Sequence, residues 1–152
     1  MISTTLSSIA GQWKAWLAAG LAATLVLALL MEGLARAVLG GPMKPAVLIC
    51  QVFGWDQSLL WLGEILHYAL GLVGFPVGYV VLRSMVAAGP GWLVGAGWGL
   101  ILFVGAGAVM APAAGLTPFF GGGTMMVASL IAHLAYGFVL GAVFARFRAD
   151  TA

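Results

Sequence analysis

Four long apolar segments, separated by glycine, proline and charged residues, dominate the sequence. They cover residues 15–39, 58–82, 92–111 and 125–145. Each segment has about 20 residues or more, which is the length an α-helix needs to cross the hydrocarbon core of a bilayer. Short connections join them, so consecutive helices are expected to be antiparallel. The pattern predicts an all-α integral membrane protein, an up-down bundle of four transmembrane helices forming a single membrane domain over residues 1–152.

The ends of these segments carry residues that stop a helix. Gly40-Gly41-Pro42 follows the first segment and Pro112 follows the third, because proline lacks the N–H that the helix would need. Arg146 and Arg148 follow the fourth segment. Pro76 lies inside the second segment, where it predicts a kink.

The composition agrees with a membrane protein and excludes several other classes. Of 152 residues, 63% are hydrophobic and only 7% are charged, whereas soluble domains carry about 25% charged residues. The stretch from Ser84 to Ala145 contains no Asp, Glu, Lys or Arg. The net charge of +2 comes from scattered basic residues, which do not form a patch that could hold a nucleic acid. We therefore expect the lipid bilayer as a partner and no nucleic acid.

Basic residues predict the orientation. Lys14, Arg83, Arg146 and Arg148 flank the N-terminus, the second connection and the C-terminus, whereas Lys44 is the basic residue outside a segment on the other side. Cytoplasmic loops are enriched in Lys and Arg, so both termini are expected in the cytoplasm. The chain resembles small bacterial four-helix membrane proteins, which implies the bacterial cytoplasmic (inner) membrane.

Glycines recur at intervals of four residues in three of the segments. They are Gly74 and Gly78 in the second segment, Gly91, Gly95 and Gly99 in the third, and Gly137 and Gly141 in the fourth. Residues four apart lie on one helix face, and small residues there let two membrane helices approach closely. This spacing predicts a tightly packed bundle in which the three-glycine row is the strongest contact.

Two short motifs occur once in each half of the chain. M-x-P-A is found at 43–46 and 110–113, and H-x-A-x-G is found at 67–71 and 133–137. The interval from Met to His is 24 residues in the first half (67 − 43) and 23 in the second (133 − 110). The repeat favours two duplicated helical hairpins, related by an axis along the membrane normal.

Polar side chains concentrate in the predicted outer half of the bundle. They are Glu32, Arg36, Glu64, His67, Tyr68, His133 and Tyr136. The two histidines lie eight or nine residues inside the second and fourth segments, which places both roughly 12 to 14 Å below the outer interface. Ionisable groups at membrane depth are costly and usually functional. We therefore predict one buried polar cluster built around His67 and His133.

Three interpretations of this cluster stay open. In the first, it fixes helix register in a non-enzymatic subunit or accessory protein of a larger membrane complex, whose partners are other subunits or further copies of the chain. In the second, His67 and His133 are the axial ligands of one b-type haem. In the third, Glu32, Glu64 and the histidines relay protons or a small cation. An enzyme is less favoured, because the sequence has no serine nucleophile elbow and no paired Cys/His metal motif.

The connection over residues 40–57 is itself apolar. Its central part, residues 46–53, contains few polar side chains. Such a segment is expected to dip into the membrane interface or to cover the polar cluster as a lid.

Overall fold

The apolar segments of the chain all form helices. A computed structural model describes residues 7, 9–86 and 89–149. This part of the chain is 88% helical and contains no strand, because backbone polar groups inside a bilayer must hydrogen-bond within their own segment. Four helices in it are long and apolar enough to cross a membrane. The predicted all-α fold with four membrane-spanning helices is confirmed, and the chain is a multi-pass membrane protein.

The first three long helices each contain a short π-helical stretch, whereas the fourth is continuous. The first contains α2 (Trp13–Leu29), the π-helix η1 (Leu30–Leu34) and α3 (Ala35–Leu39). The second contains the 3-10 helix η2 (Gln57–Leu59), α5 (Leu60–Ala69), the π-helix η3 (Leu70–Gly74) and α6 (Phe75–Met85). The third contains α7 (Gly91–Val104), the π-helix η4 (Gly105–Met110) and α8 (Ala111–Ala113), and the fourth is α9 (Gly123–Ala149). The connections carry α4 (Pro45–Phe53) and the 3-10 helix η5 (Pro118–Gly121).

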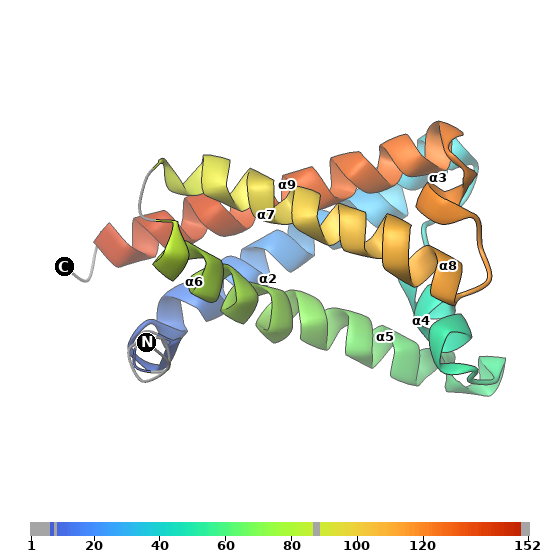
Figure 1. The fold of residues 1–152 in the computed structure, drawn as a ribbon, viewed down its shortest axis with the longest axis horizontal. Coiled ribbons are helices and arrows are strands. Elements are labelled where there is room, and N and C mark those ends of the chain that lie inside the picture. The colour runs from blue at the N-terminus through green and yellow to red at the C-terminus, as the bar shows by residue number, and fades with distance from the viewer. Residues whose placement is uncertain (1–6, 8, 87–88, 150–152) are drawn as a thin grey trace.

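Consecutive long helices run in opposite directions. The start of α2, the end of α9 and the connection from α6 to α7 lie at one end of the bundle, called here the α6–α7 end (Figure 1). The opposite end, called the α4 end, holds α4 and α8 (Figure 1). α9 packs on α7 along one side and on α2 along another, while α2 also packs on η3 and α6. α9 is therefore the central element of the bundle.

Glycine brings α7 and α9 into direct backbone contact. A Cβ added at Gly95 would collide with the carbonyl oxygen of Gly137 and with Cα of Gly141. A Cβ added at Gly99 would collide with the carbonyl oxygen of His133, and one at Gly91 with that of Gly141. Because these oxygen and Cα atoms all belong to the backbone, no side-chain rotation could relieve the collisions. This face of α7 must therefore consist of glycines for the two helices to come so close.

The two glycines of the second long helix behave differently from each other. Gly78 faces α7, where an added Cβ would meet the ring of Trp98. Gly74 is exposed, and an added Cβ would meet only the side chain of Leu70 in the same helix. Gly74 thus makes no contact between helices within the described residues.

Polar side chains form hydrogen bonds with the backbone at both ends of the second long helix. At the α6–α7 end, Arg83 donates hydrogen bonds to the carbonyl oxygens of Val86 (2.5 Å) and Gly89 (3.0 Å). At the α4 end, Asp56 caps the helix by accepting a hydrogen bond from the Ser58 N–H at 2.8 Å. This bond lowers the pKa of the Asp56 carboxyl, because it stabilises the ionised form.

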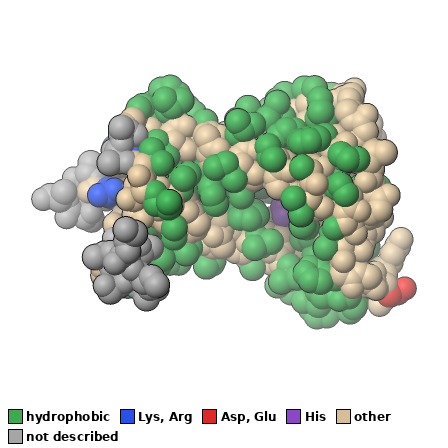
Figure 2. Space-filling view, in the orientation of Figure 1, with side chains coloured by type: hydrophobic (Ala, Val, Ile, Leu, Met, Phe, Trp, Pro, Cys, Tyr) green, Lys and Arg blue, Asp and Glu red, His purple; other side chains and the backbone are tan. Residues whose placement is uncertain are grey.

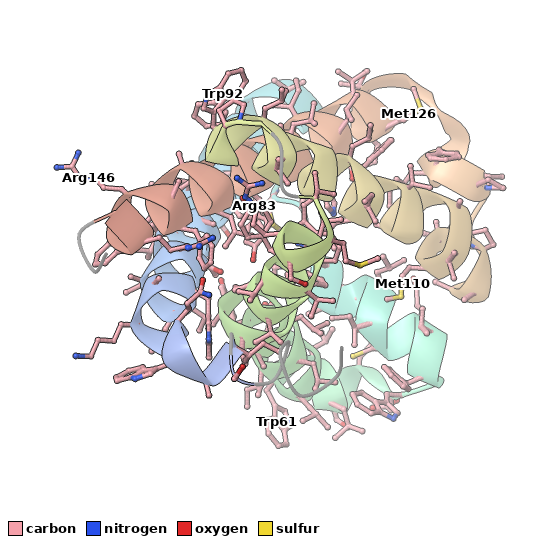
Figure 3. All side chains as sticks on the ribbon, turned by 60° about the vertical axis from the view of Figure 1, so that its left-hand side comes forward. Trp61, Arg83, Trp92, Met110, Met126 and Arg146 are labelled. Carbon is pink, nitrogen blue, oxygen red and sulfur yellow. The ribbon has the colours of Figure 1, made fainter. Side chains whose placement is uncertain are left out.

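The surface of the bundle is largely hydrophobic. In the view of Figure 2, hydrophobic side chains cover the middle of the molecule and charged side chains lie toward its two ends. Trp61 and Trp92 point outward, and Arg146 points away from the bundle (Figure 3). The two tryptophans belong to opposite ends and are 59% and 46% exposed, as expected for rings that prefer the two membrane interfaces.

The glycine contact generates the first prediction. Gly95→Ala should lower the free energy of unfolding by about 1 to 3 kcal/mol, because the added methyl group forces two backbones apart. The matched control is Gly97→Ala, since Gly97 lies on the same helix with no atom near its added Cβ. That control should be neutral or stabilising by up to about 1 kcal/mol, because alanine favours a helix over glycine. Reversible unfolding of both variants in mixed micelles measures the difference, and equal effects would contradict the proposed contact.

Candidate functional site

His67 lies on the inward face of α5. It falls between Gly63 and Gly71, which are both buried and four residues away on either side, so the three share one helix face. Its imidazole is half-buried, and Nδ1 is fully buried without a hydrogen-bond partner among the described residues. An unpaired buried nitrogen is costly, which makes it a candidate for contact with a bound group.

His133 is held in one orientation on α9. Its Nδ1 lies 2.7 Å from the carbonyl oxygen of Ser129, one helical turn earlier. A carbonyl oxygen can only accept, so the proton of the neutral ring is on Nδ1 and Nε2 is left as an acceptor. The ring also packs edge-on against Phe103 of α7, with 6.2 Å between the centroids. Both contacts aim Nε2 in a defined direction.

The two histidines belong to two different long helices. His67 lies on α5 and His133 on α9. No hydrogen bond joins them within the described residues. Nor do the residues that the structure describes contain a group of three His, Cys, Asp or Glu side chains able to hold a metal ion. A group bound at either residue would therefore be held by imidazole nitrogen.

Glu32 and Arg36 lie outside the predicted cluster. They form an ion pair in which Arg36 Nη2 lies 2.8 Å from Glu32 Oε2, and their side chains are 65% and 60% exposed. The reason is helix rotation: Leu27, Met31 and Ala35 are buried at intervals of four, so a side chain one residue later points about 100° away from the interior. The expectation that this pair is buried beside the histidines must therefore be corrected.

Tyr68 and Glu64, the aromatic and acidic neighbours of His67 on the same helix, differ in their exposure. Tyr68 is 43% exposed, because it follows His67 by one residue and is turned away from the inward face. Its expected burial is not observed. Glu64 is half-buried and forms no hydrogen bond or ion pair with any residue in the described ranges. Of the predicted polar residues, the two histidines and Tyr136 therefore have the clearest inward positions.

Tyr136 connects α9 to the second long helix. Its hydroxyl donates a buried hydrogen bond of 2.6 Å to the carbonyl oxygen of Gly71 in η3. In this π-helix the Phe75 N–H donates to Leu70, five residues earlier. The next donor in that pattern would be Pro76, which has no N–H. The Gly71 oxygen therefore lacks a partner in its own helix, and Tyr136 supplies one.

A cavity of about 440 Å³ lies at the α4 end beside His133. Met31 and Ala132 form part of its wall, and Leu48 of α4 covers it together with neighbouring residues of the first connection. The predicted loop over residues 40–57 is thus largely the helix α4, and it covers this cavity. In Figure 2 a histidine side chain is visible at a hollow between hydrophobic side chains.

Thr24 is a polar residue of the site that the sequence analysis did not select. It is buried on α2, and its hydroxyl lies beside Gly71 without a hydrogen-bond partner among the described residues. Its place four residues after Gly20, another buried residue of α2, was the available signal. The apolar wall of the cavity carried no comparable signal, because in a membrane protein most positions are apolar.

Comparison with known proteins gives a family and nothing further. Residues 12–152 match the model described as a family of unknown function (DUF6789). No curated protein and no solved structure matches the chain.

The hydrogen bond from Tyr136 generates the second prediction. Tyr136→Phe keeps the ring but leaves the Gly71 oxygen unpaired in an apolar interior, so it should lower the free energy of unfolding by roughly 0.5 to 2 kcal/mol. Tyr68→Phe is the matched control, because Tyr68 is exposed and should change stability by less than about 0.5 kcal/mol. Unfolding in mixed micelles measures both. A Tyr136→Phe variant as stable as the control would show that this bond contributes nothing.

Proposed function

This chain belongs to the family DUF6789, and we propose that it is a non-enzymatic membrane subunit or accessory protein that assembles with other membrane-spanning helices. The single observation that carries this proposal is the ion pair of Glu32 and Arg36, which faces outward from a membrane-spanning helix. The partner is a second membrane subunit or a further copy of the chain. The membrane proposed is the bacterial inner membrane, with the N- and C-termini in the cytoplasm.

The depth of the ion pair makes lipid a poor neighbour for it. Glu32 lies seven residues before Leu39, where the first long helix ends, which is about 10 Å along the helix axis. A charged residue near the centre of a membrane helix costs about 2.5 to 3.5 kcal/mol on insertion scales, and less toward the interface. Pairing lowers this cost, but Glu32 Oε1 and Arg36 Nη1 have no hydrogen-bond partner within the described residues. A polar partner helix would supply one.

Small residues next to the ion pair would let such a helix approach. Gly33 and Ala37 are both exposed and four residues apart, and no atom lies within 4 Å of a Cβ added at Gly33. Together with Leu29, which is 73% exposed, and the Glu32–Arg36 ion pair, they form the surface called here the 29–37 face. It combines a close-approach site with hydrogen-bonding groups, the two features that drive helix association in membranes.

Enlarging Gly33 tests this face. Gly33→Leu should weaken assembly by roughly tenfold or more in dissociation constant, equal to about 1.4 kcal/mol, because the side chain fills the space a partner helix would use. Native electrophoresis of the complex, extracted from cell membranes in polymer-bounded lipid discs, reports its size relative to the 15.6 kDa chain.

The matched control is Gly97→Leu on α7. Gly97 is also exposed with no atom near its added Cβ, so this variant adds the same side chain to another face and should leave the assembly unchanged. A wild-type chain that migrates as a monomer, or equal behaviour of both leucine variants, would overturn the proposal.

Haem binding is the second candidate, favoured by the orientation of His133. Its Nδ1–H is fixed on the Ser129 carbonyl, the kind of outer contact that orients imidazoles toward a metal. His67, on α5, has a buried Nδ1 that is unpaired among the described residues. These two residues would hold the iron of a b-type haem through their ring nitrogens.

An absorbance spectrum tests the haem hypothesis directly. Protein produced with an ample haem supply should show a Soret band, and His67→Ala and His133→Ala should each remove it, because each variant deletes one axial ligand. Tyr68→Phe is the control, since its ring neighbours His67 without offering a nitrogen, and it should keep the band. A wild-type protein without a Soret band would exclude this candidate.

A further inference from the structure

The cavity at the α4 end has the size and lining of a binding site for a small molecule. Its volume of about 440 Å³ lies within the range of pockets that bind compact organic ligands, roughly 300 to 1,000 Å³. Leu27, Met31, Leu48, Phe120 and Ala132 contribute apolar wall. An apolar cavity does not hold water well, and leaving it empty forfeits the dispersion contacts of its lining. An apolar ligand in the cavity avoids both costs, because it excludes water and restores the dispersion contacts.

His133 gives this wall a half-buried polar point of attachment, whereas the other polar lining residues, Lys44, Gln51 and Thr117, are exposed. His133 lines the cavity, and its Nδ1–H is already used by the Ser129 carbonyl. Nε2 has no hydrogen-bond partner among the described residues and, in the neutral ring, can only accept. A ligand that fits both wall and nitrogen must therefore bring a hydrogen-bond donor.

The position of the cavity indicates where such a ligand would come from. It lies under α4 at one end of a membrane-spanning bundle, next to the lipid that surrounds the helices. Lys44, which is exposed, lies at its edge. The volume is suited to one alkyl chain or a small ring system, and a phospholipid with two long acyl chains would not fit inside it.

We propose that this cavity binds a single-chain apolar molecule bearing a hydroxyl group, which donates a hydrogen bond to Nε2 of His133. Phe103 and the Ser129 carbonyl act as positioning groups, because they fix the orientation of this imidazole ring. α4 covers the bound chain. The 29–37 face lies on another side of the first long helix.

Nitrogen NMR can observe this contact at a single atom. The chain has two histidines, so protein labelled with ¹⁵N-histidine gives few ring signals, and His67→Gln identifies those of His133. The probe is 1-decanol, and the comparison probe is decyl methyl ether, which has a similar tail and no donor. 1-Decanol should shift the Nε2 signal of His133 upfield in a saturable manner. The ether should bind roughly three- to tenfold more weakly, because one hydrogen bond is lost, and should cause little shift of this signal.

A filled cavity provides the second measurement. Leu48→Trp places a large side chain into the cavity from α4 and should abolish the 1-decanol shift. Val52→Trp is the control, because Val52 lies on the same helix outside the cavity lining. Circular dichroism verifies that both variants keep their helices, and the two probes compared on the wild-type protein decide the question if Leu48→Trp does not fold.

Each other outcome contradicts the proposal in a specific way. Equal shifts with alcohol and ether would show that no donor is recognised. A response to decanoate but not to 1-decanol would assign the site to anions held by Lys44. A shift that persists in Leu48→Trp would place the alcohol elsewhere, and a Soret band in the purified protein would mean that iron occupies Nε2.

Discussion

The backbone contact between α7 and α9 is the constraint on which the rest of the structure depends. Within a bilayer, apolar side chains gain little by leaving lipid for one another, so close backbone packing and hydrogen bonds determine how helices associate. Gly95 and Gly99 fit against α9 at Gly137 and His133 with no room for a Cβ. This fit fixes both the height and the rotation of α9. The direction of the His133 ring follows from it, because that ring lies beside Phe103 of the same partner helix.

A hydrogen bond from α9 joins the second long helix to the α7–α9 pair, at a point where the second helix leaves one of its own carbonyl oxygens unpaired. Pro76 and the π-helix η3 leave the Gly71 carbonyl without a donor in its own helix, and Tyr136 donates to it from α9. Because such an oxygen would be costly if left unpaired in lipid, the bond selects one alignment of the two helices. His67 lies one turn before Gly71, so the same bond also sets its height relative to His133.

The sequence was sufficient for the helices but not for their rotation. Helix length and hydropathy are local properties, so the four membrane-spanning helices were predictable, as was a stop near Pro112. The burial of Glu32 and Arg36 depended instead on which face the first long helix turns toward the interior, and Met31 rather than Glu32 occupies that face. π-Helical stretches such as η3 arise from tertiary contacts and defects like Pro76, so residue spacing did not predict them. The repeated motifs also differ in setting, since Pro45 starts α4 whereas Pro112 lies within α8.

The cavity and the 29–37 face share one structural element. Met31 lines the cavity and Glu32, the next residue, points outward, and both belong to η1. π-Helical turns within α-helices occur frequently at functional sites. A rotation of η1 that alters the wall of the cavity must also move the Glu32–Arg36 pair, because the two side chains are fixed to the same turn of backbone. If an occupant of the cavity favours one rotation of η1, it changes the affinity for a partner helix on the 29–37 face. By thermodynamic linkage, the partner helix then changes the affinity for the occupant by the same factor.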